Sequence, residues 1–406
     1  MTTIDPRVEH ARSLDDPRST PFERLQRVTR RLPRLPGSDT STFWWLLAVL
    51  AVLNIVGLVM VLSASSVVSL QETGSSWTYF IKQTEWMVLG TLAAAALCYL
   101  DLSKMRRFSL VALGLCALGL LAVHIPGLGV TSNGATRWIG IGPIQIQPSE
   151  VTKLGVLLFV ADWLASHQKR LRVARVSVNP VMLVLGVIAL LIMVQPNLGT
   201  TIIVALIVFS VLFSAGVPRR ALAVWGVFGV AATVAMAMGS TYRRARVLSF
   251  LHPWADPQLN GYQLIQSRVG LASGGAFGVG LGSSRAKWGF LPFAHTDFIF
   301  SIIGEELGLV GAVVVILLFV ALGALGIKVA INADRPFHRY LATGITAWLV
   351  FQAFVNIGAV IGILPITGVP LPFISYGGTS LLVTLAGAGV LLNVARHPAP
   401  PRPASR

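Results

Sequence analysis

The stretch Ala294-His295-Thr296-Asp297-Phe298 stands where a long polar connection, residues 239–297, meets an apolar run. Connections this long are uncommon in compact proteins and are usually either functional or disordered. Six cations lie in this one: Arg243, Arg244, Arg246, Arg268, Arg285 and Lys287. Its aromatic residues include Trp254, Tyr262, Phe277, Trp288, Phe290 and Phe293. They favour an ordered, packed segment, and we predict that this connection is the working part of the molecule.

The composition of the chain indicates a membrane protein. Of its 406 residues, 54% are hydrophobic and only 12% are charged, and the mean hydropathy is +0.73. Soluble proteins contain about 25% charged residues. The net charge of +16 does not indicate a nucleic-acid partner, because most cations lie in short loops beside apolar runs, as orientation signals do. Cys98 and Cys116 fall inside apolar runs, which is typical of small buried residues rather than of a disulfide or metal site.

Apolar runs alternate with polar loops on both sides of the opening stretch. A helix needs roughly 20 apolar residues to cross the hydrocarbon. The runs are residues 43–62, 80–100, 108–125, 151–166, 181–194, 198–215, 221–238, 298–327, 340–364 and 380–394. The sequence therefore predicts an all-α polytopic membrane protein with ten transmembrane helices.

The distribution of cations sets the orientation of these helices. Cytoplasmic loops are rich in Lys and Arg, and most of the 32 cations fall on the side of the N-terminus. We predict that both termini are cytoplasmic and that the connection 239–297 is extracellular. Residues 1–41 are interpreted as a disordered basic cytoplasmic tail, residues 42–396 as the transmembrane domain and residues 397–406 as a second cytoplasmic tail.

Asp297 is the main candidate for catalysis, as a lone acid beside basic loops. Glu305 and Glu306 lie about 12–14 Å further along a helix, too far for the paired carboxylates of a glycosidase. A single carboxylate suits a general base acting on an anionic, phosphate-bearing substrate. His295 and Asp297 supply only two ligands for a protein-held transition metal, so such a site is weakly indicated.

A second candidate group lies near the start of the run 151–166. Glu150 and Lys153 are three residues apart and share one helix face. The polar loop before them, residues 133–140, contains Arg137. These groups could bind an anionic substrate, but an internal Glu–Lys pair that satisfies two buried charges explains the spacing equally well.

Seven motifs carry a resemblance to a known family. They are Val61 to Ser66, Asn133 to Ile139, Gln147 to Lys153, Gln195 to Thr200, His295 to Phe298, Gly304 to Gly308 and Pro370 to Ser380. In this order, between about residues 43 and 396, they resemble the shape, elongation, division and sporulation family of membrane glycosyltransferases. The end of the first apolar run and the long basic tail are more similar to the division branch than to the elongation branch.

The resemblance implies a polymerase of lipid II, the undecaprenyl-diphosphate-linked disaccharide pentapeptide, at the division septum of the cell membrane. It implies Asp297 as the catalytic base, with Arg137, Lys153 and Arg246 suited to the leaving diphosphate. The other substrate-binding residues that we predict are Glu150, Arg243, His295 and Ser375. A Mg²⁺ ion on the substrate diphosphate is compatible with this chemistry. The implied partners are a class B penicillin-binding protein, which is the septal transpeptidase, and other divisome proteins.

One position departs from the family pattern, and two other functions stay open. Family members commonly have Asp where this chain has Asn197, which cannot act as a base, so a helix-capping role before Leu198 is one alternative. Buried charges such as Glu150, Lys153, Glu305 and Glu306 could instead line the path of a lipid II transporter. No inverted repeat supports that reading. A scaffold that only recruits the transpeptidase is the third hypothesis.

Overall fold

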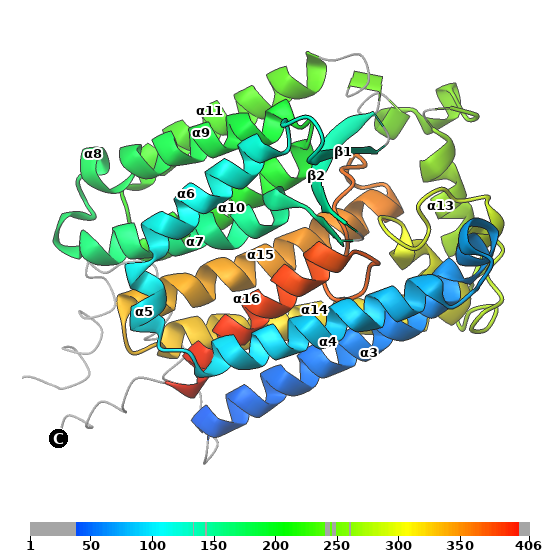
Figure 1. Cartoon of the computed structure of the whole chain (residues 1–406), viewed down its shortest axis with the longest axis horizontal. Helices are drawn as coiled ribbons and strands as arrows, with labels where there is room; N and C mark the ends of the chain where they lie inside the picture. The colour runs from blue at the N-terminus through cyan, green and yellow to red at the C-terminus, as the bar shows by residue number, and fades with distance from the viewer. Residues whose placement is uncertain are drawn as a thin grey trace, which may run out of the picture.

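The computed structural model describes residues 38–397 apart from 133, 143, 240–243, 246–248 and 260. The described chain is mostly helical, and its long helices lie alongside one another in a bundle (Figure 1). The long helices are α3 (Ser38–Thr73), α4 (Thr78–Tyr99), α6 (Ser109–Ala122), α7 (Pro148–Ser166), α9 (Asn179–Val194), α10 (Leu198–Ala215), α11 (Arg219–Met238), α14 (Ile299–Asn332), α15 (Pro336–Ile361) and α16 (Gly378–Arg396). Shorter helices are α5 (Leu102–Arg107), α8 (Ala174–Ser177), α13 (Tyr262–Ser273) and the 3₁₀ turns η1 (Gln168–Arg170), η2 (Pro253–Ala255) and η3 (Ala286–Trp288).

Seven helical segments in the described part of the chain are long and apolar enough to span a membrane. They are α3, the continuous stretch Ala174–Val194 that joins α8 to α9, α10, α11, α14, α15 and α16. The other three predicted runs coincide with α4, α6 and α7. α6 has only 14 residues, and α7 carries Glu150, Lys153 and Asp162. Each of the ten apolar runs thus overlaps one helix. The number that crosses the membrane and the direction of each stay predictions.

A small sheet between α6 and α7 corrects the all-α prediction. Strands β1 (Gly129–Ser132), β2 (Ala135–Ile141) and β3 (Ile144–Ile146) pair antiparallel in the order β1-β2-β3. β-branched and aromatic residues, which favour strands, face one another across the pairs, as in Val130 with Trp138 and Ile139 with Ile146. The sheet and α13 lie at the same end of the bundle (Figure 1).

α14 is interrupted at Gly308, whose φ of 68° and ψ of −167° are not helical. The backbone groups freed there bind residues 275–280 of the long connection. The N–H groups of Val279 and Gly280 donate to the carbonyls of Glu305 and Glu306, and the N–H groups of Leu309 and Val310 donate to Gly275 and Ala276. A helix can break at membrane depth only when other groups satisfy its backbone in this way.

The long connection is ordered where it is described, but its aromatic residues do not pack as predicted. Trp254 is 71% exposed, Phe277 83% and Trp288 65%. The segment is instead held by Leu264, Ile265, Ser267 and Gly270 of α13, which are buried. The prediction of packed aromatics assumes that water surrounds the segment, and in a membrane protein exposed rings can face lipid instead.

The predicted tails lie almost wholly outside the described residues. α3 begins at Ser38 and α16 ends at Arg396. The predicted bounds of the transmembrane domain, residues 42–396, stay a prediction. Residues 1–37 and 398–406 are not described.

Candidate active site

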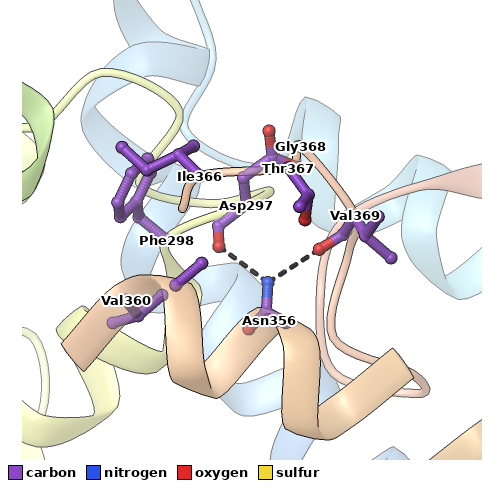
Figure 2. A pocket seen from close by; sticks show the side chains of 9 residues that line it. Asp297, Phe298, Asn356, Val360, Ile366, Thr367, Gly368 and Val369 are labelled. Atoms are coloured by element: carbon purple, nitrogen blue, oxygen red, sulfur yellow. Dashed lines mark hydrogen bonds between the residues drawn. The ribbon is translucent and has the colours of Figure 1, made fainter. Parts of the chain in front are cut away.

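The backbone of the motif residues 295–297 is anchored at three successive carbonyls. Tyr376 N–H donates to the His295 carbonyl at 3.0 Å, and the Ser375 hydroxyl donates to the Thr296 carbonyl at 2.6 Å. Asn356 Nδ2 donates to the Asp297 carbonyl at 2.8 Å and, at the same distance, to the Val369 carbonyl (Figure 2). These three bonds fix the position of Asp297 through its main chain, independently of the protonation state of its carboxyl group.

Asp297 lines a small pocket and is partly exposed. The pocket is formed by Asp297, Phe298, Asn356, Ala359, Val360, Ile366, Thr367, Gly368 and Val369 (Figure 2). Among these lining residues Asp297 is the only carboxylate. Mg²⁺ in enzymes is usually held by one or two carboxylates together with substrate oxygens. An ion at this pocket would therefore depend on the substrate, and the predicted Mg²⁺ stays a prediction.

Residues 366–369, in the loop between α15 and α16, line the pocket together with Asp297. Gly368 has φ of +70°, and a Cβ built on it would lie 3.5 Å from Asp297 Oδ2, so the loop backbone approaches the carboxyl group closely. Two other glycines let helices reach this loop. A Cβ on Gly57 of α3 would collide with the Phe373 carbonyl, and a Cβ on Gly199 of α10 would crowd Thr367 and Val369.

His295 lies beside Asp297 in sequence but packs between aromatic rings. Its ring centroid is 5.4 Å from that of Tyr79 and 5.6 Å from that of Tyr376. Its Nδ1 is buried and has no hydrogen-bond partner among the described residues. Burial lowers the pKa of the imidazole below its ordinary value, against the opposing effect of the Glu72 charge. His295 is therefore neutral near pH 7, and its predicted contact with substrate stays a prediction.

Glu150 and Lys153 form an internal pair. Their charged atoms are 2.8 Å apart, and the residues are 2% and 1% exposed. Lys153 Nζ also donates to Gln352 Oε1 at 2.8 Å, and Gln352 Nε2 donates to the Pro370 carbonyl at 2.9 Å. The pair thus connects α7 through α15 to the loop that faces Asp297. This arrangement fits the internal-pair alternative, and no substrate contact follows from it.

Arg137 and Asn197 organise the start of α10. Arg137, on β2, donates from Nε to the Gln195 carbonyl at 3.0 Å and from Nη2 to the Pro196 carbonyl at 2.7 Å. Asn197 Oδ1 accepts from Thr200 N–H at 3.2 Å, which confirms the helix-capping alternative. The predicted cations Arg243 and Arg246 lie outside the described residues.

Glu305 and Glu306 form a separate, deeply buried cluster. Glu305 accepts from the Ser284 hydroxyl and from the N–H groups of Arg285 and Ala286. Glu306 lies 3.3 Å from Lys287 Nζ and accepts from the Ser63 hydroxyl at 2.7 Å. These carboxylates tie α14 to α3 and to the end of the long connection. Among the described residues no group of three or more His, Cys, Asp or Glu side chains is placed to hold a metal.

Sequence reasoning missed Asn356 and Gln352. Both are buried on α15, at 2% and 0% exposure, and they lie four residues apart on one helix face. Polar residues inside an apolar run are costly unless they have a role, so this spacing was a usable signal. Ser375 was predicted to bind substrate, but it is buried and its hydroxyl holds the backbone of Thr296. Its contact with substrate stays a prediction.

The sequence is similar to a protein family and to several of its individual members. The model of the FtsW, RodA and SpoVE family, described as cell cycle protein, matches residues 43–399. A probable peptidoglycan glycosyltransferase FtsW of Mycobacterium tuberculosis is 40% identical over 361 residues, covering 89% of this chain and 69% of the relative. The protein of that name from Geobacter metallireducens is also 40% identical, covering 83% of this chain and 90% of the relative. Stage V sporulation protein E of Bacillus subtilis is 37% identical, covering 88% of this chain and 98% of the relative.

Two solved structures share the fold. A chain from the structure described as "Structural coordination of polymerization and crosslinking by a peptidoglycan synthase complex" has a TM-score of 0.72 and 33% identity, covering 87% of this chain and 97% of that one. The crystal structure of the rod shape determining protein RodA of Thermus thermophilus has a TM-score of 0.65 and 30% identity, covering 87% of this chain and 96% of that one.

Fold and site together define a multi-pass helical membrane protein with a backbone-anchored carboxylate at one end of its bundle. Of its described helices, seven meet the length and hydropathy of a membrane span. The chain belongs to the FtsW, RodA and SpoVE family. The family resemblance predicted from its seven motifs is therefore confirmed.

Proposed function

We propose that this protein polymerises lipid II into β-1,4-linked glycan strands during septal cell-wall synthesis, with Asp297 as general base. The observation that carries the proposal is the threefold backbone anchoring of residues 295–297 beside a pocket. A catalytic base must be held in a fixed position to reach the proton that it removes. Family membership and the printed names of the FtsW relatives support the same activity.

The proposed reaction joins two lipid-linked sugars. The Asp297 carboxylate accepts the proton of the acceptor 4-hydroxyl while this oxygen attacks the anomeric carbon of the donor. The bond from that carbon to the lipid diphosphate breaks, and direct displacement inverts the α-linked donor to a β linkage. Cations favour the charge that develops on the leaving diphosphate. From the family resemblance we assign this role to Arg246, with Arg137 and Lys153 in support.

The proposed topology has ten membrane spans, both termini in the cytoplasm and the connection 239–297 outside. Asp297 then faces the side on which cell-wall polymer is assembled. The implied partner is a class B penicillin-binding protein. One structural relative comes from a peptidoglycan synthase complex that coordinates polymerization with crosslinking, which is in line with this pairing. The FtsW names of relatives at 40% identity favour a division role over an elongation role.

A lipid II transporter is the second candidate, and one observation speaks for it. α14 is broken at Gly308, and discontinuous helices form substrate sites in many transporters. In this chain, however, the freed backbone groups bind residues 275–280 of the same protein. The break is thus filled by protein, and this favours the polymerase.

A polymerisation assay tests the proposal. Purified protein with its transpeptidase partner and lipid II is expected to give glycan strands, and Asp297→Ala is expected to give none. Asp256→Ala, which removes another acid of the same connection, is the matched control and should retain activity. Glycan made by Asp297→Ala at the wild-type rate would reject the proposal. Lipid II movement across vesicles that is unaffected by Asp297→Ala would favour the transporter.

A further inference from the structure

One side of α14 carries a continuous stripe of exposed apolar residues. It begins at Leu309, which is 64% exposed, and ends at Ile327, just before the exposed Lys328. The members of the stripe include Leu309, Val310, Val313, Val314, Leu317, Val320 and Ile327. Before the break at Gly308 the helix is different, because residues 299–306 are all buried within the protein.

The length of the stripe matches a lipid bilayer. From residue 309 to residue 327 a helix rises about 27 Å at 1.5 Å per residue, and the hydrocarbon of a membrane is about 30 Å thick. A stripe of this length, followed by a lysine, has the dimensions of a lipid-facing surface. If the stripe spans the hydrocarbon, the break at Gly308 lies at one of its edges.

The turn of residues 274–282 is fixed at this edge. Its backbone is hydrogen-bonded to α14 on both sides of the break. The glycines of the turn make this approach possible, since a Cβ on Gly278, whose φ is +82°, would overlap the Glu306 carbonyl. The apolar side chains of the turn point away from the protein, and Phe277, Val279 and Leu281 are all exposed.

We propose that the turn of residues 274–282 is a membrane-interface anchor, with Phe277 and Leu281 inserted among the lipids of the leaflet on the side of α13. The turn continues the lipid-facing stripe of α14 at the depth where a bilayer changes from hydrocarbon to headgroups. Aromatic residues are enriched at that depth, and the nearby exposed Arg285 suits lipid phosphate. This continuity favours lipid over a protein partner as the occupant.

The anchor would fix the height of the candidate site above the bilayer. The turn is bound to the backbone of Glu305 and Glu306, and the Glu305 carboxylate binds residues 284–286, which follow the turn. Contacts of the turn with lipid are thereby transmitted to the segment that leads to Asp297. This inference does not depend on the chemistry proposed for Asp297.

Depth-dependent fluorescence quenching tests the anchor. Phe277→Cys is labelled with the fluorophore NBD in the full-length protein, which is reconstituted in phosphatidylcholine nanodiscs. Leu317→Cys in the stripe and Gln258→Cys, an exposed polar site of the same connection, are the matched controls. Cys98 and Cys116 are buried, and protein without an added cysteine measures their background labelling. Thermal unfolding of each labelled variant in detergent, compared with that of the wild type, verifies folding.

The label at residue 277 is expected to emit at shorter wavelength than the label at residue 258. It should lose emission most strongly to lipids with a nitroxide near the carbonyl, whereas residue 317 responds most to a nitroxide deep in the acyl chain. Leu281→Cys gives a second reading if Phe277→Cys fails to fold. Emission at residues 277 and 281 that is quenched by aqueous iodide as strongly as at residue 258, and not by lipid nitroxides, would overturn the proposal.

Discussion

Acidic residues lie in two regions near the start of α14, and the protein holds them differently. Asp297, just before the helix, is held through its backbone carbonyl, and its side chain lies at a pocket. Glu305 and Glu306, eight and nine residues later, are held through their carboxylates. Serine hydroxyls, backbone N–H groups and Lys287 bind them. Around Asp297 the hydrogen bonds hold the main chain. At Glu305 and Glu306 the carboxylates themselves make the contacts that hold α14 to its neighbours.

The difference separates a candidate catalytic acid from structural ones without reference to any relative. A carboxylate whose oxygens are saturated by buried donors would lose these contacts if it took up a proton from substrate. An acid positioned through its main chain keeps its anchors in either protonation state. The five predictions below test this division, from the largest expected effect to the smallest.

Asp297→Asn is expected to lower lipid II polymerisation by about 10²–10⁴-fold, the usual contribution of a general base. Because Asn356, Ser375 and Tyr376 bind backbone atoms, these three anchors should survive the substitution. Rates of glycan synthesis and thermal unfolding in detergent would be measured on the same preparation. A loss of stability that parallels the loss of rate would place Asp297 with the structural acids.

Glu306→Ala is expected to destabilise the protein by about 3–5 kcal/mol, the usual effect of leaving a buried charge without its partner. The charge left behind is that of Lys287, which is 4% exposed. Thermal unfolding in detergent measures the change. Glu306→Leu combined with Lys287→Met removes both charges and should cost less. If the double variant is less stable than Glu306→Ala, the unpaired charge of Lys287 is not the cause of the destabilisation.

Asn356→Ala is expected to lower the free energy of unfolding by about 1–3 kcal/mol, because the carbonyls of Asp297 and Val369 lose a buried donor. The rate of polymerisation should fall more than thermal stability does, since Asp297 is the group displaced. Thr346→Ala on the same helix is the control. Its hydroxyl is buried without a hydrogen-bond partner among the described residues, so its removal should cost little.

Asn197→Ala is expected to cost about 1 kcal/mol of stability through loss of the cap on α10. Asn197→Asp should restore the cap, because both residues accept from the same N–H group. Thermal unfolding measures both variants. Polymerisation by Asn197→Asp should equal that of the wild type. A clear rise in its rate would mean that this position supplies a second acid and that Asp297 does not act alone.

The pH dependence of stability should reveal the buried imidazole of His295. Burial lowers its pKa below the ordinary value of about 6.5, so the unfolded chain takes up a proton first as the pH falls. Stability is therefore unaffected above about pH 6.5 and declines below it, until the folded protein is protonated as well. His295→Phe, which keeps a ring between Tyr79 and Tyr376, should flatten this decline in thermal unfolding between pH 5 and pH 8. An unchanged decline would show that other groups cause it.

The helices could be predicted from the sequence because hydropathy is a local property. Every predicted run overlaps a helix, and the motif containing Asp297 was found at the right junction. The break at Gly308 was missed because the apolar run continues across it. The short sheet was missed because its strands, of four, seven and three residues, lie inside one connection between two apolar runs.

Contacts between distant parts of the chain could not be predicted. Asn356 lies 59 residues from Asp297 in sequence, and nothing in its own neighbourhood points to that partner. For Lys153 the pattern allowed either an internal pair or a substrate contact. The pair with Glu150 becomes visible only in three dimensions, and the substrate contact stays a prediction. The surroundings of Trp254 and Phe277 were misjudged because a sequence does not state whether water or lipid lies beside a ring.

The anchoring of residues 295–297 also bears on how the protein is made. Ser375 is synthesised 79 residues after Thr296, whose carbonyl it holds. A ribosome therefore completes α14 and α15 before Ser375 and Tyr376, two of the three partners of the motif, exist. The motif is fully anchored only once the loop ahead of the last helix has left the exit tunnel. A nascent or truncated chain ending before that loop would sit in the membrane without a competent centre.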